Sequence, residues 1–165
     1  MEERNPTHDT EGRLGTVEAK VRKIVESLGE DVGYQFCNWV QANVALDKVE
    51  KPTIIYVLPP SGSFHFKWNE VLDRPNAQIA FVSPTDFDFD GAENDGIVEA
   101  MKRLCIRFVR AVNASGYFSE LEDDIPYQVL YDHLDENVTG IVISPTLTED
   151  AGINLCNDPE RLEIE

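Results

Sequence analysis

The chain has 165 residues, 14 basic and 31 acidic side chains and a formal net charge of −17. Its length predicts a single domain, and a hydrophobic content of 42% is too high for a wholly disordered protein. So acidic a surface repels phosphate backbones and anionic headgroups, which excludes the usual classes of nucleic-acid-binding and membrane-surface proteins.

The N-terminal region is polar to about residue 15, which predicts an extended N-terminal segment. It lacks the apolar stretch of a signal peptide. The apolar runs elsewhere have the length of strands and are far shorter than the roughly 20 residues that span a bilayer. The cysteines, Cys37, Cys105 and Cys156, are widely spaced and odd in number. They predict free thiols in a reducing compartment.

Two helices are predicted from apolar spacing. Apolar residues three and four apart predict the first helix from Thr16, a candidate N-cap, to Gly29. Residues 30–51 predict a turn followed by a second helical or irregular segment. The clearest helix follows Gly91, where Asp90 fits a capping box and residues 113–116 end the helix. Its apolar stripe consists of Ile97, Val98, Met101, Leu104, Cys105, Phe108, Val109 and Val112.

Several segments have the patterns of strands. Residues 53–58 are apolar throughout, which predicts a central strand covered on both faces. Residues 63–68 alternate, with Phe64 and Phe66 opposed to His65 and Lys67, and predict a half-buried strand. Turns are expected at residues 59–62 and 73–76, and a third strand at 78–83. The segments 127–134 and 138–144 predict two strands in a hairpin-like arrangement.

This order of elements predicts an α+β fold. The expected architecture is a small, mostly antiparallel sheet packed on one side by an N-terminal helix and one long central helix. The sequence becomes polar from residue 145 and acidic toward its end. The predicted organisation is therefore an extended N-terminal segment at 1–15, one domain at 16–150 and an acidic tail at 151–165.

Asp86, Asp88 and Asp90, followed by Gly91, match the first half of an EF-hand calcium loop. The second half does not match, because Ile97 stands where the bidentate Glu is needed. A strand, not a helix, is also expected before the loop. The segment is interpreted as a connector that caps the following helix, and a weak cation site is the remaining alternative.

No catalytic cluster is evident elsewhere. Asp132 and His133 would point to opposite faces of a strand, and His8 and His65 are scattered. Residues 59–63 lack the lysine and the helix of a phosphate loop. Acidic residues at 120–124 could serve a metal-dependent nuclease, but the charge balance leaves little to hold its substrate. We therefore expect a non-enzyme without a catalytic, cofactor or metal site.

Three segments together resemble small virion proteins of tailed bacteriophages and prophages of gut bacteria. They are residues 52–60 (PTIIYVLPP), residues 86–91 (DFDFDG) with the helix that ends at 111–118 (AVNASGYF), and residues 129–142 (VLYDHLDENVTGIV). The chain resembles their neck components, the tail terminators and the head–tail connector or ring proteins, over about residues 17–156.

The resemblance implies a tail-terminator-like fold and a ring-forming structural protein that joins the portal or capsid to the tail. Its implied partners are copies of itself and other neck, portal or tail proteins, with genomic DNA only in transit and no membrane. The implied location is the virion neck, after assembly in the host cytoplasm. No cofactor is implied. Candidate interface anchors are Trp39, Trp68, Tyr117 and Phe118.

A ring through which DNA passes would benefit from an acidic lumen, because like charges keep DNA from adhering. The candidate residues for such a lumen or an acidic outer surface are Asp86, Asp88, Glu120, Glu122, Asp123 and Asp124. Two alternatives stay open. One is an acidic adaptor or inhibitor that mimics nucleic acid and binds a host protein. The other is a metal-dependent hydrolase that uses Asp86, Asp88 and Asp90.

Overall fold

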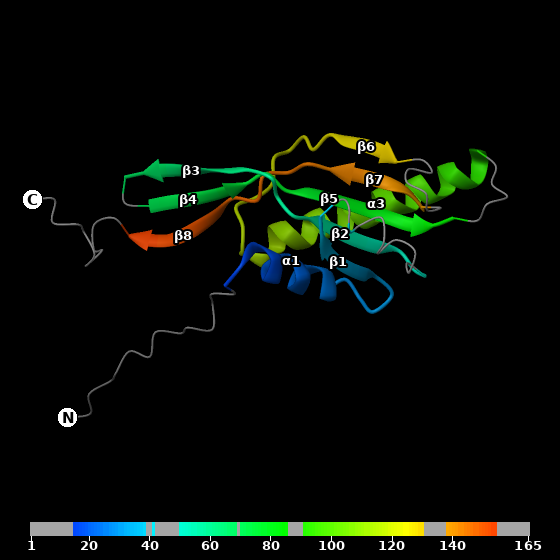
Figure 1. The fold of residues 1–165 in the computed structure, drawn as a ribbon, viewed down its shortest axis with the longest axis horizontal. Helices are drawn as coiled ribbons and strands as arrows, with labels where there is room; N and C mark the ends of the chain where they lie inside the picture. The colour runs from blue at the N-terminus through cyan, green and yellow to red at the C-terminus, as the bar shows by residue number, and fades with distance from the viewer. Residues whose placement is uncertain are drawn as a thin grey trace, which may run out of the picture.

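The computed structural model describes residues 15–38, 41, 50–68, 70–85, 91–130 and 138–154. These residues form two helices and eight strands in an α+β arrangement, as predicted (Figure 1). In chain order they are α1 (Val17–Glu26), β1 (Gly33–Cys37), β2 (Thr53–Val57), β3 (Gly62–Lys67), β4 (Glu70–Pro75), β5 (Gln78–Pro84), α3 (Gly91–Ser115), β6 (Tyr127–Leu130), β7 (Val138–Ile143) and β8 (Glu149–Asn154).

The body of the molecule contains a five-stranded sheet in the order β1-β2-β5-β7-β6. The β1–β2 pair is parallel, and every other neighbouring pair in this sheet is antiparallel. The expected mostly antiparallel sheet is thus confirmed. All five residues of β2 are buried, which also confirms the prediction of a central strand covered on both faces.

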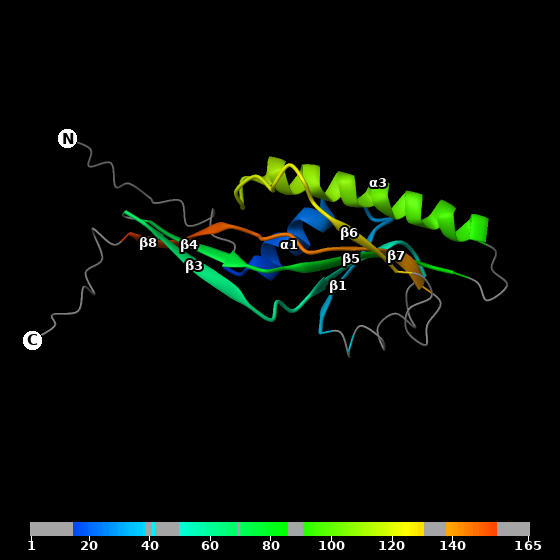
Figure 2. The same cartoon turned by 90° about the horizontal axis from the view of Figure 1, so that it is seen from above.

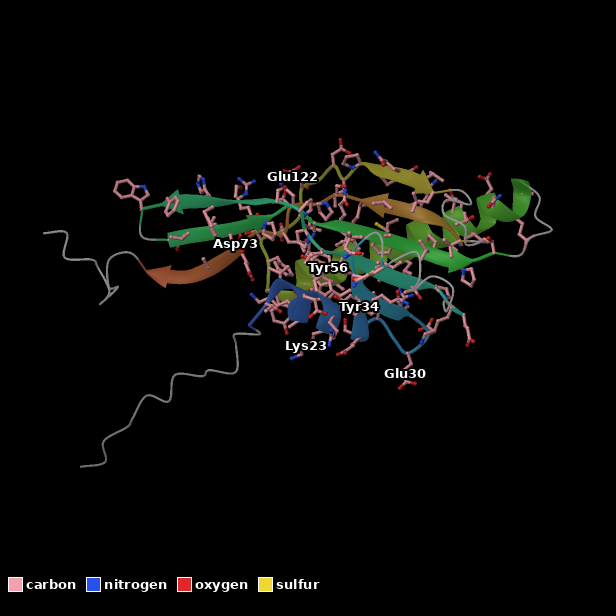
Figure 3. All side chains as sticks on the ribbon, viewed as in Figure 1. Lys23, Glu30, Tyr34, Tyr56, Asp73 and Glu122 are labelled. Atoms are coloured by element: carbon pink, nitrogen blue, oxygen red, sulfur yellow. The ribbon has the colours of Figure 1, made fainter. Side chains whose placement is uncertain are left out.

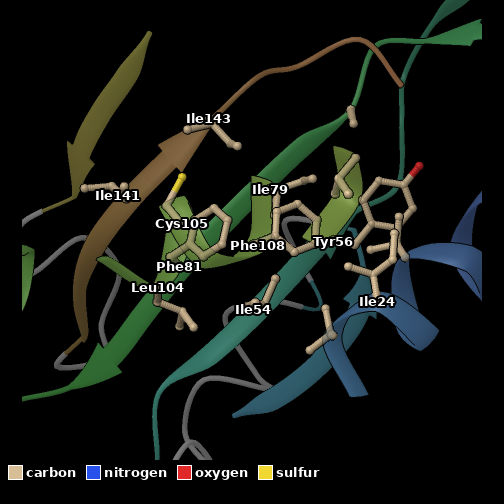
Figure 4. Close-up of a cluster of buried hydrophobic side chains, with 14 of the residues drawn as sticks. Ile24, Ile54, Tyr56, Ile79, Phe81, Leu104, Cys105, Phe108, Ile141 and Ile143 are labelled. Carbon is tan, nitrogen blue, oxygen red and sulfur yellow. The ribbon is translucent and has the colours of Figure 1, made fainter. Parts of the chain in front are cut away.

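Helices α1 and α3 pack on the same face of this sheet (Figure 2). Side chains from both helices and from β2, β5 and β7 share one core, in which the rings of Phe81 and Phe108 meet edge to face at a centroid distance of 5.6 Å (Figure 4). The opposite face of the sheet is also apolar and buried, with Ile55, Val82 and Val142 among its members. Burial of these apolar side chains is the main stabilising contribution to the fold.

The helix ends follow local chemistry. Thr16 is the N-cap of α1, and its side chain accepts a hydrogen bond from the Ala19 backbone N–H at 3.1 Å. The predicted apolar stripe of α3 supplies its buried residues, and Gly116 follows the helix with a φ of 71°. The predicted capping box at Asp90 lies outside the described residues.

Strands β3, β4 and β8 form a separate antiparallel sheet that projects from the body, here called the arm (Figures 1 and 2). Only two residues separate β4 from β5. Backbone hydrogen bonds at this junction join Ala77 N–H to the Pro145 carbonyl at 3.0 Å and Leu147 N–H to the Pro75 carbonyl at 3.1 Å. The arm is therefore anchored to the central strands by the backbone itself.

Four local predictions were wrong. Strand β1 forms where a turn and then a helical or irregular segment were expected, although residues 39–40 and 42–49 lie outside the described part. Residues 73–76 were expected to turn, but β4 runs through Pro75 because pairing with β3 and β8 overrides local turn preference. Strand β8 extends to Asn154, although residues 151–165 were expected to form an acidic tail outside the domain. Strand β3 forms as predicted, but all six of its residues are exposed.

Candidate functional site

Among the described residues, the side chains most often used in catalysis are dispersed. His65 lies on the exposed strand β3, and burial raises the pKa of the Cys105 thiol to about 11. Burial also raises the pKa of Cys37, so both thiols are poor nucleophiles near neutral pH. Within the described ranges, no group of three or more His, Cys, Asp or Glu side chains is placed to hold a metal ion. His8, Asp132 and His133 lie outside those ranges.

Two tyrosines lie between α1 and the sheet (Figure 3). The Tyr34 hydroxyl donates a hydrogen bond to the Glu18 carboxylate at 3.2 Å, and burial together with this carboxylate raises the Tyr34 pKa. Burial is also the main cause that raises the pKa of Tyr56 to about 12. Both hydroxyls therefore stay protonated at neutral pH, and the cluster fits a structural role in the core.

The arm carries the most unusual surface of the molecule. The exposed fractions of Phe64, Phe66 and Trp68 are 65%, 68% and 94%. Phe64 and Phe66 are two positions apart in β3, so they point to the same side and form what we call the aromatic face. Neighbouring exposed aromatic side chains of this size typically mark a surface that binds another macromolecule.

The strand register places the aromatic face on the same side of the arm as the helices. Phe64 is opposite Asp73 in β4, and Asp73 is opposite Glu149 in β8. Directly opposed residues in antiparallel strands project from the same face. Glu149 forms an ion pair with Lys20 of α1. The aromatic face is thus a continuation of the helix-covered face, at a point where α1 and α3 do not reach.

Trp68 occupies a strained position at the tip of the β3–β4 hairpin. Lys67 pairs with Glu70, so only Trp68 and Asn69 connect the two strands. Trp68 has a φ of 47°, in the left-handed region that favours Gly, Asn or Asp in two-residue hairpin loops. A large aromatic residue that is both strained and exposed contributes little to the folded monomer.

A second apolar surface lies between α3 and β6. It is a groove of about 540 Å³, which we call the α3–β6 groove. Ile106 on α3 and Tyr127 on β6 line it and are 58% and 49% exposed. The Lys102 ammonium group lies 5.2 Å from the centre of the Tyr127 ring, which fixes one wall of the groove. Since α3 packs mainly over β5 and β7, the helix-facing side of β6 is left partly open.

The acidic loop, residues 120–124, borders the same groove. Leu121 anchors it: the side chain is buried, and its backbone N–H donates to the Asn113 side-chain oxygen at 2.9 Å. The predicted surface carboxylates of this loop are all exposed, namely Glu120, Glu122, Asp123 and Asp124. Glu122 lies near the point where the arm joins the body (Figure 3). Asp86 and Asp88, the other acidic candidates, lie outside the described residues.

The predicted interface anchors have different environments. Trp68 is exposed at the arm tip, whereas Phe118 is only 6% exposed and belongs to the core, with the Lys20 ammonium 5.9 Å from its ring centre. In this chain Phe118 is thus a core residue, and Tyr117 is partly buried against the same core. Trp39 lies outside the described residues.

The sequence argument did not select the aromatic face or the groove. Phe64 and Phe66 were recognised as one side of a strand, but alternation alone cannot show that no described part of the chain covers that side. Ile106 lies outside the predicted apolar stripe of α3. The position of this apolar residue off the stripe was the only indication of the groove in the sequence. An apolar residue off the stripe of an amphipathic helix is a useful indication of a second surface.

Within the described residues, no helix is both long and apolar enough to cross a bilayer. Comparison with models of known protein families and with curated proteins finds no match.

Proposed function

We propose that this chain is a structural protein of a tailed-bacteriophage virion. In this proposal it forms a ring in the neck, as a tail terminator or head–tail connector, and joins the portal or capsid to the tail. The resemblance of residues 52–60, 86–118 and 129–142 to neck proteins suggests the class. The observation that carries the proposal is the projecting arm with its uncovered aromatic face.

Two separate apolar surfaces on one chain support assembly into a ring. The aromatic face is on the arm, whereas the α3–β6 groove is on the body, and the two consist of different residues. A contact between different surfaces of identical chains is heterologous, and such contacts generate closed rings when the rotation between neighbours closes. No catalytic step is needed in this role, and DNA would meet the protein only in transit through the ring.

The test is the mass and symmetry of the oligomer. We expect native mass spectrometry and electron microscopy of the purified chain to give one closed cyclic species. The chain should be examined alone and together with the proteins encoded by neighbouring genes, because a partner ring can template assembly. A chain that stays monomeric under both conditions contradicts the proposal.

A matched pair of variants links assembly to the arm. Replacing Phe64 and Phe66 together with Ser should abolish the oligomer while leaving the fold intact, because both side chains are already exposed in the monomer. His65→Ser changes the opposite side of the same exposed strand and should leave the oligomer unchanged. Equal effects of both changes would show that the aromatic face has no special role.

A further inference from the structure

We propose that the α3–β6 groove of one copy receives strand β3 of a second copy, so that the aromatic face fills the groove. This inference rests on the proposed function, which requires copies of the chain to bind one another. It adds the identity of the two surfaces that meet.

The first argument is the apolar fit. The aromatic face is exposed in the chain on its own, and burying it in a groove would remove two large aromatic side chains from water. The groove has a volume of about 540 Å³, within the range that encloses groups larger than an aromatic side chain. Its apolar lining includes Ile106, Val109 and Tyr127.

The second argument is charge. Copies that each carry a net charge of −17 repel one another, so contacts are favoured where the local charge is reversed. From Lys51 to Asn69, the stretch that includes β3, the sequence has no acidic residue, and Lys67 is the one formally charged residue within β3. The groove lining combines the acidic Glu122, Asp123 and Asp124 with the basic Lys102 and Arg110. A contact between β3 and this mixed lining therefore brings less like charge together than a contact between two acidic surfaces of the chain would.

The third argument is the position of the two strands. β3 and β6 are terminal strands of their sheets, and each pairs on one side only with the described strands. Both lie along the same side of the molecule, the upper side in Figure 1. Open strand edges readily accept another strand. The backbone of β3 can therefore approach β6 while its aromatic face enters the groove.

This assignment changes the role expected for the acidic loop. Glu122 and Asp123 would lie at a contact between copies, instead of on the channel wall expected from the sequence.

The experiment is a mixing test with two variants. The arm variant is Phe64→Ser with Phe66→Ser, and the groove variant is Ile106→Glu; all three positions are exposed in the monomer. We expect each variant alone to be monomeric by native mass spectrometry. A 1:1 mixture should give a species with one copy of each, because the intact arm of one variant meets the intact groove of the other.

Two controls keep the result interpretable. Arg103→Glu changes an exposed position of α3 outside the groove lining and should assemble like the unaltered chain. If Ile106→Glu unfolds the chain, Tyr127→Glu replaces it on the opposite wall of the groove. Folding of every variant is checked by its cooperative thermal transition.

The outcomes separate this inference from the proposed function. If the unaltered chain forms a ring but the variants do not complement each other, the arm–groove contact is wrong and the ring stands. If the variants complement each other but the unaltered chain is a closed pair of copies, the contact stands and the ring is wrong. An unaltered chain that is always monomeric overturns both.

Discussion

Lys20 of α1 and Glu149 of β8 form an ion pair at the base of the arm, with side-chain exposures of only 13% and 11%. This pair joins the first helix to the last described strand, two elements far apart in the sequence. Lys20 also lies near the Phe118 ring, so its ammonium group is enclosed by the core and by the arm. The orientation of the arm relative to α1 is thus fixed by a mostly buried electrostatic contact as well as by the backbone.

Removing one partner of this ion pair should lower the free energy of unfolding, whereas replacing both partners with apolar residues should change it little. Lys20→Met leaves the Glu149 carboxylate mostly buried without its partner and should lower the free energy of unfolding by about 3 kcal/mol. The double variant Lys20→Met with Glu149→Leu should recover most of this loss. Urea unfolding measures both values. Equal stability of the single variant and the unaltered chain would mean that water already solvates the pair.

Trp68→Gly should stabilise the monomer and weaken assembly. Glycine adopts the φ of 47° without steric cost, so we expect a gain of about 1 kcal/mol in the free energy of unfolding. The same change removes an aromatic side chain that is 94% exposed and available to a neighbour.

Trp68→Phe is the matched control, because it keeps both the strain and an aromatic ring. Thermal unfolding and native mass spectrometry report the two effects separately. If Trp68→Gly destabilised the monomer, Trp68 would have a role within its own chain.

Gly140→Ala should disrupt the central sheet. A Cβ atom at Gly140 would lie 1.8 Å from the Phe81 carbonyl oxygen, so β7 could not keep its position beside β5. We expect a loss of about 3 kcal/mol or more in the free energy of unfolding. Gly96→Ala is the control: nothing lies within 4 Å of its added Cβ, and alanine in this helix should stabilise by about 0.5–1 kcal/mol. Comparable effects of the two changes would contradict the close approach.

Stability should fall at alkaline pH. The pKa of Tyr56 is about 12 in the folded chain against 10.0 without burial, and that of Cys105 is about 11 against 9.0. Because these pKa values are raised by folding, their contribution to stability is complete below pH 9 and is lost as the pH rises to about 12.

Urea unfolding at pH 8, 10 and 11 should therefore show a decreasing free energy of unfolding. Tyr56→Phe should reduce the slope above pH 10, because it removes one of the titrating groups. The same slope in Tyr56→Phe as in the unaltered chain would place Tyr56 outside the alkaline transition.

The elements with strong periodicity could be predicted from the sequence. The apolar run of β2 and the stripe of α3 identified a buried strand and a long helix, since burial on both faces or on one face leaves a distinct pattern. β4 could not be predicted, because Asp73 and Pro75 resemble a turn and only the register with β3 and β8 makes them a strand. β8 could not be predicted for the same reason, because its polar sequence becomes a strand only through pairing with β4.

The candidate site was predictable only in part. Trp68 and the acidic loop were selected from the sequence, and both are exposed. Phe64 and Phe66 were expected to be half-buried, because an alternating strand normally has one covered face. A cover supplied by another copy leaves the same pattern as a cover supplied by the chain itself. The sequence pattern is the same in both cases, whereas the structure shows that the described residues leave β3 exposed.

The near-continuity of β4 with β5 has a consequence for symmetry. The two strands are separated by only two residues, and the junction is braced by hydrogen bonds to the segment between β7 and β8. The arm's direction therefore follows the twist of the strands rather than a hinge. In a closed ring the angle between neighbours fixes the number of copies. The twist of the β4–β5 strands would then determine that number. Substitutions that change this twist would change how many subunits form the ring.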